Sequence, residues 1–374
     1  MDTTPISGLD ELEKHVDDLV QDPSIPLDAK LFDDVELQLT ESNTPAVIVR
    51  FLPKLTAILK QYTEDPTVLA SLAIKLLRPV SFTQVLSLAS EESLVQALDS
   101  PAPAANLLAM TVIHKAAVSS ADVAILSTMT SVVVSFIRRW LAAPQVEVGQ
   151  KGGIVLGDLL DVDCELPMPP VPGRTATHTE LVLRKSPGQG KLWRRLFTDR
   201  AIYTLLVALC AGRHADTSAN VHQLSLAQGR VLRILPRLAA LNLRAVSQSG
   251  IMATTAVSVT NGYGESDRSI PKPKQGEGLL QFAALRMVDK SDALMHLSLV
   301  DFFEAFVSLM RVTEYSVHKV EVVRALLCEA IEDDLVLKEA LLSLPERIVP
   351  EEADDLRRWL QEVMPRETNR VPLR

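Results

Sequence analysis

Apolar residues recur every three or four positions over most of the chain, and this spacing predicts amphipathic helices. The central example is the stretch 143–164, where Pro144 cannot continue a helix interior and marks a break. After the break, apolar side chains return on one predicted helix face. They are Val148, Ile154, Val155, Leu159 and Leu160. A helix, a short turn and a second helix with one apolar face form the unit of a helical-repeat protein.

Three glycines lie inside this central helix, at Gly152, Gly153 and Gly157. Glycine costs roughly 1 kcal/mol relative to alanine in a helix interior. We therefore expect another helix to pack closely against this one. Gly153 and Gly157 are four residues apart on one face, and they are the predicted contact.

The pattern of helix, break and helix occurs again on both sides of the central stretch. Prolines that open predicted helices stand at 66, 101 and 144, so they are 35 and 43 residues apart. These steps bracket the roughly 40–47 residues of HEAT and armadillo repeats. Each unit has an apolar face that only a neighbouring unit can cover. We predict an all-α fold, a curved armadillo/HEAT-like helical-repeat solenoid.

Composition divides the chain further. Residues 1–45 carry 12 acids and 2 bases and are predicted to form an acidic N-terminal helical arm. A single solenoid is expected over residues 46–364. The stretches near 161–190 and 248–278 are rich in Pro, Gly, Ser and Thr, so they are predicted to be flexible insertions. Residues 365–374 are expected to be a mobile tail.

Composition and charge also limit the class of protein. Hydrophobic residues make up 47% of the chain but aromatic residues only 4%, which favours a core of stacked helices. The net charge of −9 argues against a general nucleic-acid binder. Three widely spaced cysteines fit a reducing compartment, and no apolar run reaches the roughly 18 residues of a membrane span. We expect a soluble protein of the cytoplasm, with the nucleus as a second compartment, and no membrane partner.

No motif in the sequence predicts catalysis. The segment SPGQGK at 186–191 lacks the first glycine of a phosphate-binding loop, because Lys185 stands there, and Leu192 replaces the hydroxyl that would hold magnesium. The seven histidines show no metal-ligand spacing, and His114 and His296 are interpreted as core or groove residues. We therefore expect no enzyme, no cofactor and no metal.

One basic cluster differs from the rest of the chain. Residues 174–200 contain 7 bases and 2 acids, with Trp193, Arg194 and Arg195 at the centre. Arg and Trp are enriched at binding hot spots. Two interpretations remain open for this cluster: a solvated basic edge, or a groove for an anionic partner, nucleic acid included.

Three stretches resemble one known family. They are VGQKGGIVLGDLLDVDC (148–164), GKLWRRLFTDRAIYTLLVALC (190–210) and HLSLVDFFEAFVSLMR (296–311). They look like the fungal branch of the proteasome base-assembly chaperone, also called 26S proteasome non-ATPase regulatory subunit 5, which carries a historical DNA mismatch repair name in fungi. The resemblance extends over about residues 45–345.

The resemblance implies a curved scaffold without catalysis that is monomeric when free. It implies binding to the C-terminal domains of AAA ATPase subunits and a role in assembling the regulatory-particle base. We expect the partner surface to include Lys151, Asp158, Trp193, Arg194 and Arg195, with Trp193 as the anchor. The alternatives are a nucleic-acid-associated repair factor and a general protein-interaction scaffold.

Overall fold

The computed structural model describes residues 6–62, 64–165, 187–249, 251 and 276–364. Helices make up most of these residues, in two compact units that divide between Asp163 and Cys164. In both units, helices stack on the helices of the preceding repeat. The predicted all-α helical-repeat architecture is therefore confirmed, and the curvature of the solenoid stays a prediction.

The first unit contains short and medium-length helices joined by tight turns. They are α1 (Leu9–Gln21), α2 (Ala29–Gln38), α3 (Thr44–Leu59), α4 (Thr67–Leu77), α5 (Phe82–Leu86), α6 (Glu91–Asp99), α7 (Pro103–His114), the 3₁₀ helix η1 (Lys115–Val118), α8 (Ser120–Thr128), α9 (Thr130–Ala142) and α10 (Val146–Val162).

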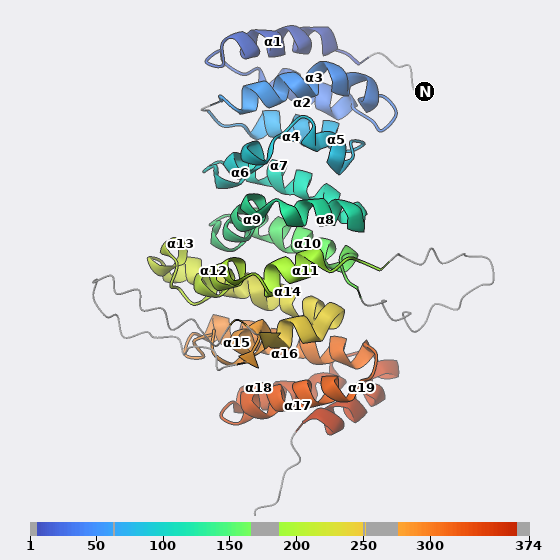
Figure 1. Ribbon diagram of the computed structural model, residues 1–374, viewed down its shortest axis with the longest axis vertical. Coiled ribbons are helices and arrows are strands. Elements are labelled where there is room, and N and C mark those ends of the chain that lie inside the picture. Colours follow the sequence, from blue (N-terminus) through green and yellow to red (C-terminus); the bar gives the residue numbers. More distant parts are fainter. Residues whose placement is uncertain (1–5, 63, 166–186, 250, 252–275, 365–374) are drawn as a thin grey trace, which may run out of the picture. The chain divides into compact units, whose positions relative to one another are not determined.

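These helices pack in two rows (Figure 1). In one row α2, α4, α7 and α10 follow one another, each against the next. In the other row α1 packs against α3, and α6 packs against α9. The pairs α3–α4, α6–α7 and α9–α10 join the two rows. Because each helix covers an apolar face of its predecessor, the rows bury one core.

The acidic N-terminal helices belong to this core. Leu12 of α1 and Phe32 of α2 are buried in the same cluster as the apolar residues of α3 and α4. On the polar side of α1, Glu13 pairs with Arg50 of α3. The prediction of a separate arm at residues 1–45 is therefore corrected, because α1 and α2 use their apolar faces to complete the first repeat and carry their acids outward.

The second unit contains longer helices and one very short strand pair. Its helices are α11 (Lys191–Phe197), α12 (Arg200–Cys210), α13 (Ala215–Ser218), α14 (Val221–Ser247), α15 (Leu279–Leu285), α16 (Ala293–Val312), α17 (Val317–Ile331), α18 (Leu335–Ser343), the 3₁₀ helix η3 (Leu344–Glu346) and α19 (Pro350–Val363). Its strands are β1 (Gln248–Ser249) and β2 (Gly276–Glu277), which pair antiparallel.

Two rows of helices recur in the second unit. α14 packs against α12 and α16, and α16 packs against α18. α15, α17 and α19 form the other row in that order. Most of the two predicted insertions, and the predicted tail at 365–374, lie outside the described residues. At the described edges, α10 extends to Val162 and the β1–β2 pair brings Gln248 beside Glu277.

Polar contacts between stacked helices reveal the repeat length. Five such contacts join residues that are 37 to 44 positions apart. They are Arg50–Glu13, Arg139–Leu98, His114–Asp158, His296–Asp334 and Arg311–Glu352. This spacing is close to the roughly 40–47 residues of HEAT and armadillo repeats. One repeat therefore advances the chain by about the length that the prolines predicted.

Many helices begin at a side chain that caps their free N–H groups. The capping oxygen comes from an Asp, Ser or Asn that directly precedes the helix, as expected for strong N-cap residues. Examples are Asp28 before α2, Ser81 before α5, Asn220 before α14, Asp292 before α16 and Ser316 before α17.

Two long helical stretches are broken at positions that differ from those the sequence indicates, since Pro236 is the residue expected to kink the second stretch, 221–246. Residues 121–141 form α8 and α9, which meet at Met129 with a bend of 94°. In α14 the helix continues through Pro236, which is buried, and its non-helical residue is Asn242. The side chain of Asn242 accepts a hydrogen bond from the Ala245 N–H, so it caps the turn that follows.

Among the described residues, α16 is long and apolar enough to cross a membrane, and the bent pair α8–α9 passes the same test of length and composition. In α16, Phe302, Phe303 and Phe306 are all buried within the second unit. Packing in the core therefore accounts for part of the apolar character of this helix, while Leu294 and Leu297 are exposed.

Candidate functional site

Two of the predicted site residues meet on the row of the first unit that contains α7 and α10. Lys151 and Asp158 of α10 both contact His114 at the end of α7. The distance from His114 Nε2 to Asp158 Oδ2 is 2.8 Å, and that from Lys151 Nζ to His114 Nδ1 is 3.3 Å. We call these three residues the His114 cluster. A neutral imidazole with its proton on Nε2 satisfies both contacts, because it donates to the carboxylate and accepts from the ammonium group.

The position of the cluster follows from the helical spacing of α10. Lys151, Ile154 and Asp158 are three and four residues apart, so they share one face. The Ile154 side chain was predicted to lie in the buried stripe, but 53% of this residue is exposed. That prediction is wrong, because the buried face of α10 runs through Val155 and Leu159 instead. An exposed apolar side chain therefore lies between the two charged residues.

Close packing against α9 holds α10 in place. A Cβ atom at Gly152 would lie 2.5 Å from Cδ1 of Trp140, whereas a Cβ atom at Gly153 would meet only Trp140 Nε1, at 3.7 Å. The close contact was predicted at Gly153 and Gly157. The structure assigns it to Gly152, because the Trp140 ring lies over that position, and Gly157 is buried as well.

The His114 cluster presents separated charges that are partly shielded from water. Burial lowers the pKa of Lys151, and the negative charge of Asp158 acts in the opposite direction. The Asp158 side chain keeps 34% of its surface exposed. Such a surface can bind charged groups of a partner. Among the described residues, no group of three potential ligands could hold a metal ion.

His114 is the member of the cluster that sequence reasoning did not assign to the site. The signal that could have found it is the repeat length. His114 lies 37 residues before Lys151 and 44 residues before Asp158, as expected for equivalent positions of neighbouring repeats.

The remaining predicted site residues lie on α11 of the second unit. Trp193 was predicted to anchor a partner, but only 4% of this residue is exposed. Its ring stacks on Phe197 with 5.3 Å between the ring centroids. The anchor role is therefore corrected, because Trp193 already fills the protein's own core.

Arg194 and Arg195 point away from that core and form ion pairs. Arg194 Nη1 lies 2.7 Å from Glu165 Oε1, and Arg195 Nη1 lies 2.9 Å from Asp199 Oδ2. Asp199 also caps α12. Burial acts to raise the pKa of Asp199, but hydrogen bonds from Arg195 and from the N–H groups of α12 outweigh this and lower it. Arg195 thus supports the turn between α11 and α12, and Arg194 is the more exposed of the two.

A second histidine–aspartate pair occurs in the second unit. Asp334 Oδ2 lies 2.8 Å from His296 Nε2 and 3.0 Å from Lys290 Nζ, and its other oxygen accepts the Leu337 N–H. We call Lys290, His296 and Asp334 the Asp334 cluster. Burial acts to raise the pKa of Asp334, but these three hydrogen bonds outweigh it and lower the pKa.

Comparison with known proteins gives one family. The family model described as DNA mismatch repair protein HSM3, N terminal domain, matches residues 8–136, which is about a third of the chain. No curated protein matches the chain. The match lies within the first unit, from α1 into α9, and the three stretches that suggested the family lie outside it. Residues 8–136 of the first unit are therefore similar to the N-terminal domain of HSM3, and this match confirms the resemblance to the fungal branch of the proteasome base-assembly chaperone family.

Proposed function

We propose that this protein is a non-catalytic chaperone that binds the C-terminal domains of AAA ATPase subunits and assists assembly of the 26S proteasome regulatory-particle base. The observation that carries the proposal is the match of residues 8–136 to the family model of the HSM3 N-terminal domain. The proposal includes a free protein that is monomeric and that acts in the cytoplasm and the nucleus.

The arrangement of the helices supports such a role. Stacked helical repeats provide a surface that needs no reordering when it binds a folded domain, so the entropic cost of association is low. A chaperone must also release its client. Charged residues favour specificity and fast association more than they favour raw affinity, so a polar interface suits reversible capture.

The His114 cluster is the proposed contact of the first unit. Lys151 and Asp158 carry opposite charges on either side of exposed Ile154, so they can meet complementary charges on a partner around one apolar contact. In the second unit Arg194 is the proposed contact, because it is exposed and held by Glu165 and by the Gln189 carbonyl oxygen. Trp193, which is buried, and Arg195, which pairs with Asp199, hold the helix that carries Arg194.

Purified C-terminal domains of the proteasomal ATPases provide the test. Each domain is immobilised in turn, and binding of the full chain is measured at low and moderate salt. We expect one or a few of the domains to bind, with weaker binding at higher salt because exposed charges are screened. The absence of binding to every ATPase domain would contradict the proposal.

The family description also mentions DNA mismatch repair, so nucleic acid is a second candidate partner. The described part of the basic cluster offers limited support, since Arg194 and Arg195 already pair with carboxylates. A DNA-binding role predicts retention of duplex DNA that falls steeply with salt and that is lost in Arg194→Glu. Binding to an ATPase domain without retention of DNA would support the chaperone proposal and contradict the DNA-binding role.

A further inference from the structure

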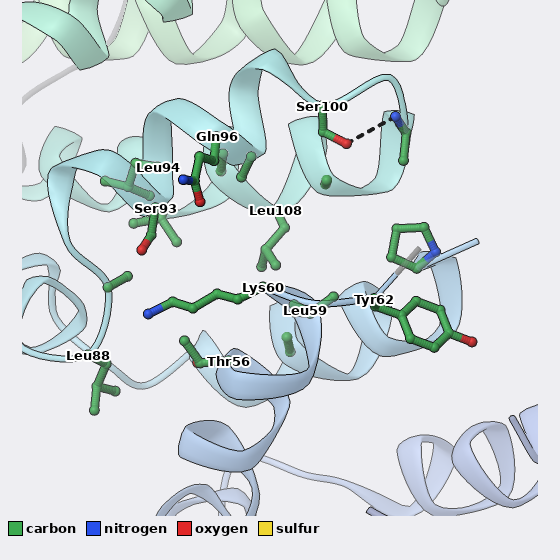
Figure 2. A pocket seen from close by; sticks show the side chains of 18 of the residues that line it. Thr56, Leu59, Lys60, Tyr62, Leu88, Ser93, Leu94, Gln96, Ser100 and Leu108 are labelled. Atoms are coloured by element: carbon green, nitrogen blue, oxygen red, sulfur yellow. Dashed lines mark hydrogen bonds between the residues drawn. The ribbon is translucent and has the colours of Figure 1, made fainter. Parts of the chain in front are cut away.

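A pocket opens between α3 and α6 in the first unit (Figure 2). Its volume is about 460 Å³, and α4, α5 and α7 complete its walls. This volume falls within the roughly 300–1,000 Å³ of small-molecule sites, which are mostly apolar with a few polar groups. The pocket lies entirely within the matched residues 8–136.

Small side chains keep the pocket open. Leu52 and Leu59 of α3 face it from one side, and Leu108 of α7 projects into it. The part of the lining that comes from α6, α7 and the turn between them includes four alanines, at positions 97, 102, 105 and 109. Protein interiors are close-packed, and few voids exceed the size of a water molecule. Apolar space of this size between two packed repeats is therefore a binding feature rather than ordinary core packing.

The charged groups of the pocket are few. Of the described residues that line it, only Lys60 and Glu64 carry a charge, and Thr56, Ser93, Gln96 and Ser100 add uncharged polar groups. In Figure 2 the Lys60 side chain extends along the pocket, away from Tyr62. Burial raises the pKa of Tyr62, and the negative charge of Glu64 adds to this. Within the described residues, Lys60 makes no ion pair and no side-chain hydrogen bond. Both Lys60 and Glu64 are exposed, so one rim of the pocket has an ammonium group without a counter-charge and the other rim has a carboxylate.

We infer that this pocket binds an amphiphile with one unbranched apolar chain and a single carboxylate head group. The chain lies among Leu52, Leu59 and Leu108, and the carboxylate pairs with Lys60, with Ser93 as a further hydrogen-bond donor on the pocket wall. The chain end points toward Tyr62 and Glu64, so a second anionic group there is repelled. This inference is independent of the proposed chaperone function.

Binding of decanoate to the full chain tests the inference. Titration calorimetry compares decanoate with decylamine, which has the same chain and the opposite charge. We expect decanoate to bind at one site and decylamine to bind at least tenfold more weakly, because Lys60 repels its ammonium group. Equal affinity for the two probes would overturn the inference.

Two variants assign the site. Lys60→Gln is expected to weaken decanoate binding about tenfold, and Lys30→Gln, which removes an exposed lysine from α2, is expected to leave it unchanged. Ala105→Leu is expected to weaken binding, because the larger side chain occupies part of the pocket. If decanoate binds Lys60→Gln as tightly as the native chain, the inference is wrong, whether or not Ala105→Leu folds.

Discussion

In the described part of each unit a histidine contacts an aspartate of the following repeat, and these two contacts differ in burial. In both, His Nε2 lies 2.8 Å from Asp Oδ2. In the first unit the Asp158 side chain is 34% exposed, whereas in the second unit the Asp334 side chain is 3% exposed. The same bond therefore links repeats at a surface in one unit and inside the structure in the other.

The difference shows how burial changes the role of a polar contact. An exposed ion pair contributes at most about 1 kcal/mol, because water solvates both charges nearly as well. A buried carboxylate must be fully hydrogen-bonded, since an unpaired polar group in the interior is costly. Asp334 meets this need with three partners, while Asp158 remains accessible to a binding partner. We interpret the Asp334 cluster as structural and the His114 cluster as a surface for recognition.

The largest expected effect is the loss of the buried carboxylate. Asp334→Ala leaves Lys290, His296 and the Leu337 N–H without their acceptor, so we expect unfolding free energy to fall by about 3 kcal/mol. Asp158→Ala removes an exposed partner and should cost less than about 1 kcal/mol. Urea denaturation of the two variants measures both values. Equal losses would contradict the assignment of different roles.

The next largest loss of stability is expected at the contact between α9 and α10, which holds the His114 cluster in place. Gly152→Ala puts a Cβ atom against the Trp140 ring, and the overpacking should destabilise the chain by about 2 kcal/mol. Gly153→Ala is the matched control. It has room for the added methyl group and should be neutral or stabilising by up to about 1 kcal/mol, because alanine favours the helix. The melting temperatures of both variants test these expectations. If Gly153→Ala lowers the melting temperature and Gly152→Ala does not, α10 packs differently from this description.

Acid pH provides a smaller and more specific effect. The pKa of Asp334 is lowered by folding, so its contribution to stability is present above the unfolded value of about 4 and is lost as pH falls through the folded value. Asp334→Asn has no such titration. The gap in unfolding free energy between the native chain and Asp334→Asn should therefore narrow from about pH 5 to about pH 3. A constant gap over this range would mean that the carboxylate is not stabilised by its partners.

Most of the fold could be predicted from the sequence, because helical periodicity and helix-opening prolines are local signals. The start of α4 after Pro66 and the repeat length of about 40 residues both follow from such signals. These local signals do not show whether the helices of residues 1–45 form a separate arm or pack against the following helices. A charge count describes the exposed face of α1 and α2, and it carries no information about where their apolar faces pack.

The candidate site could be predicted only in part. Lys151 and Asp158 were found by their spacing on one helix, but their link through His114 depends on how α7 stacks on α10. Trp193 was assigned to the surface because residue type alone does not distinguish a binding anchor from a core aromatic ring. The difference in burial between Asp158 and Asp334 could not be predicted either, since burial depends on packing between residues far apart in sequence.

Capture of an ATPase C-terminal domain by Asp158→Lys tests the role of the His114 cluster. The affinity of the best-binding domain is measured for the native chain, for Asp158→Lys and for Glu41→Lys, which reverses an exposed charge elsewhere in the first unit. We expect at least a tenfold loss for Asp158→Lys, which corresponds to about 1.4 kcal/mol, and no change for Glu41→Lys. Unchanged capture by a folded Asp158→Lys variant would show that the His114 cluster only links repeats and does not contact the partner.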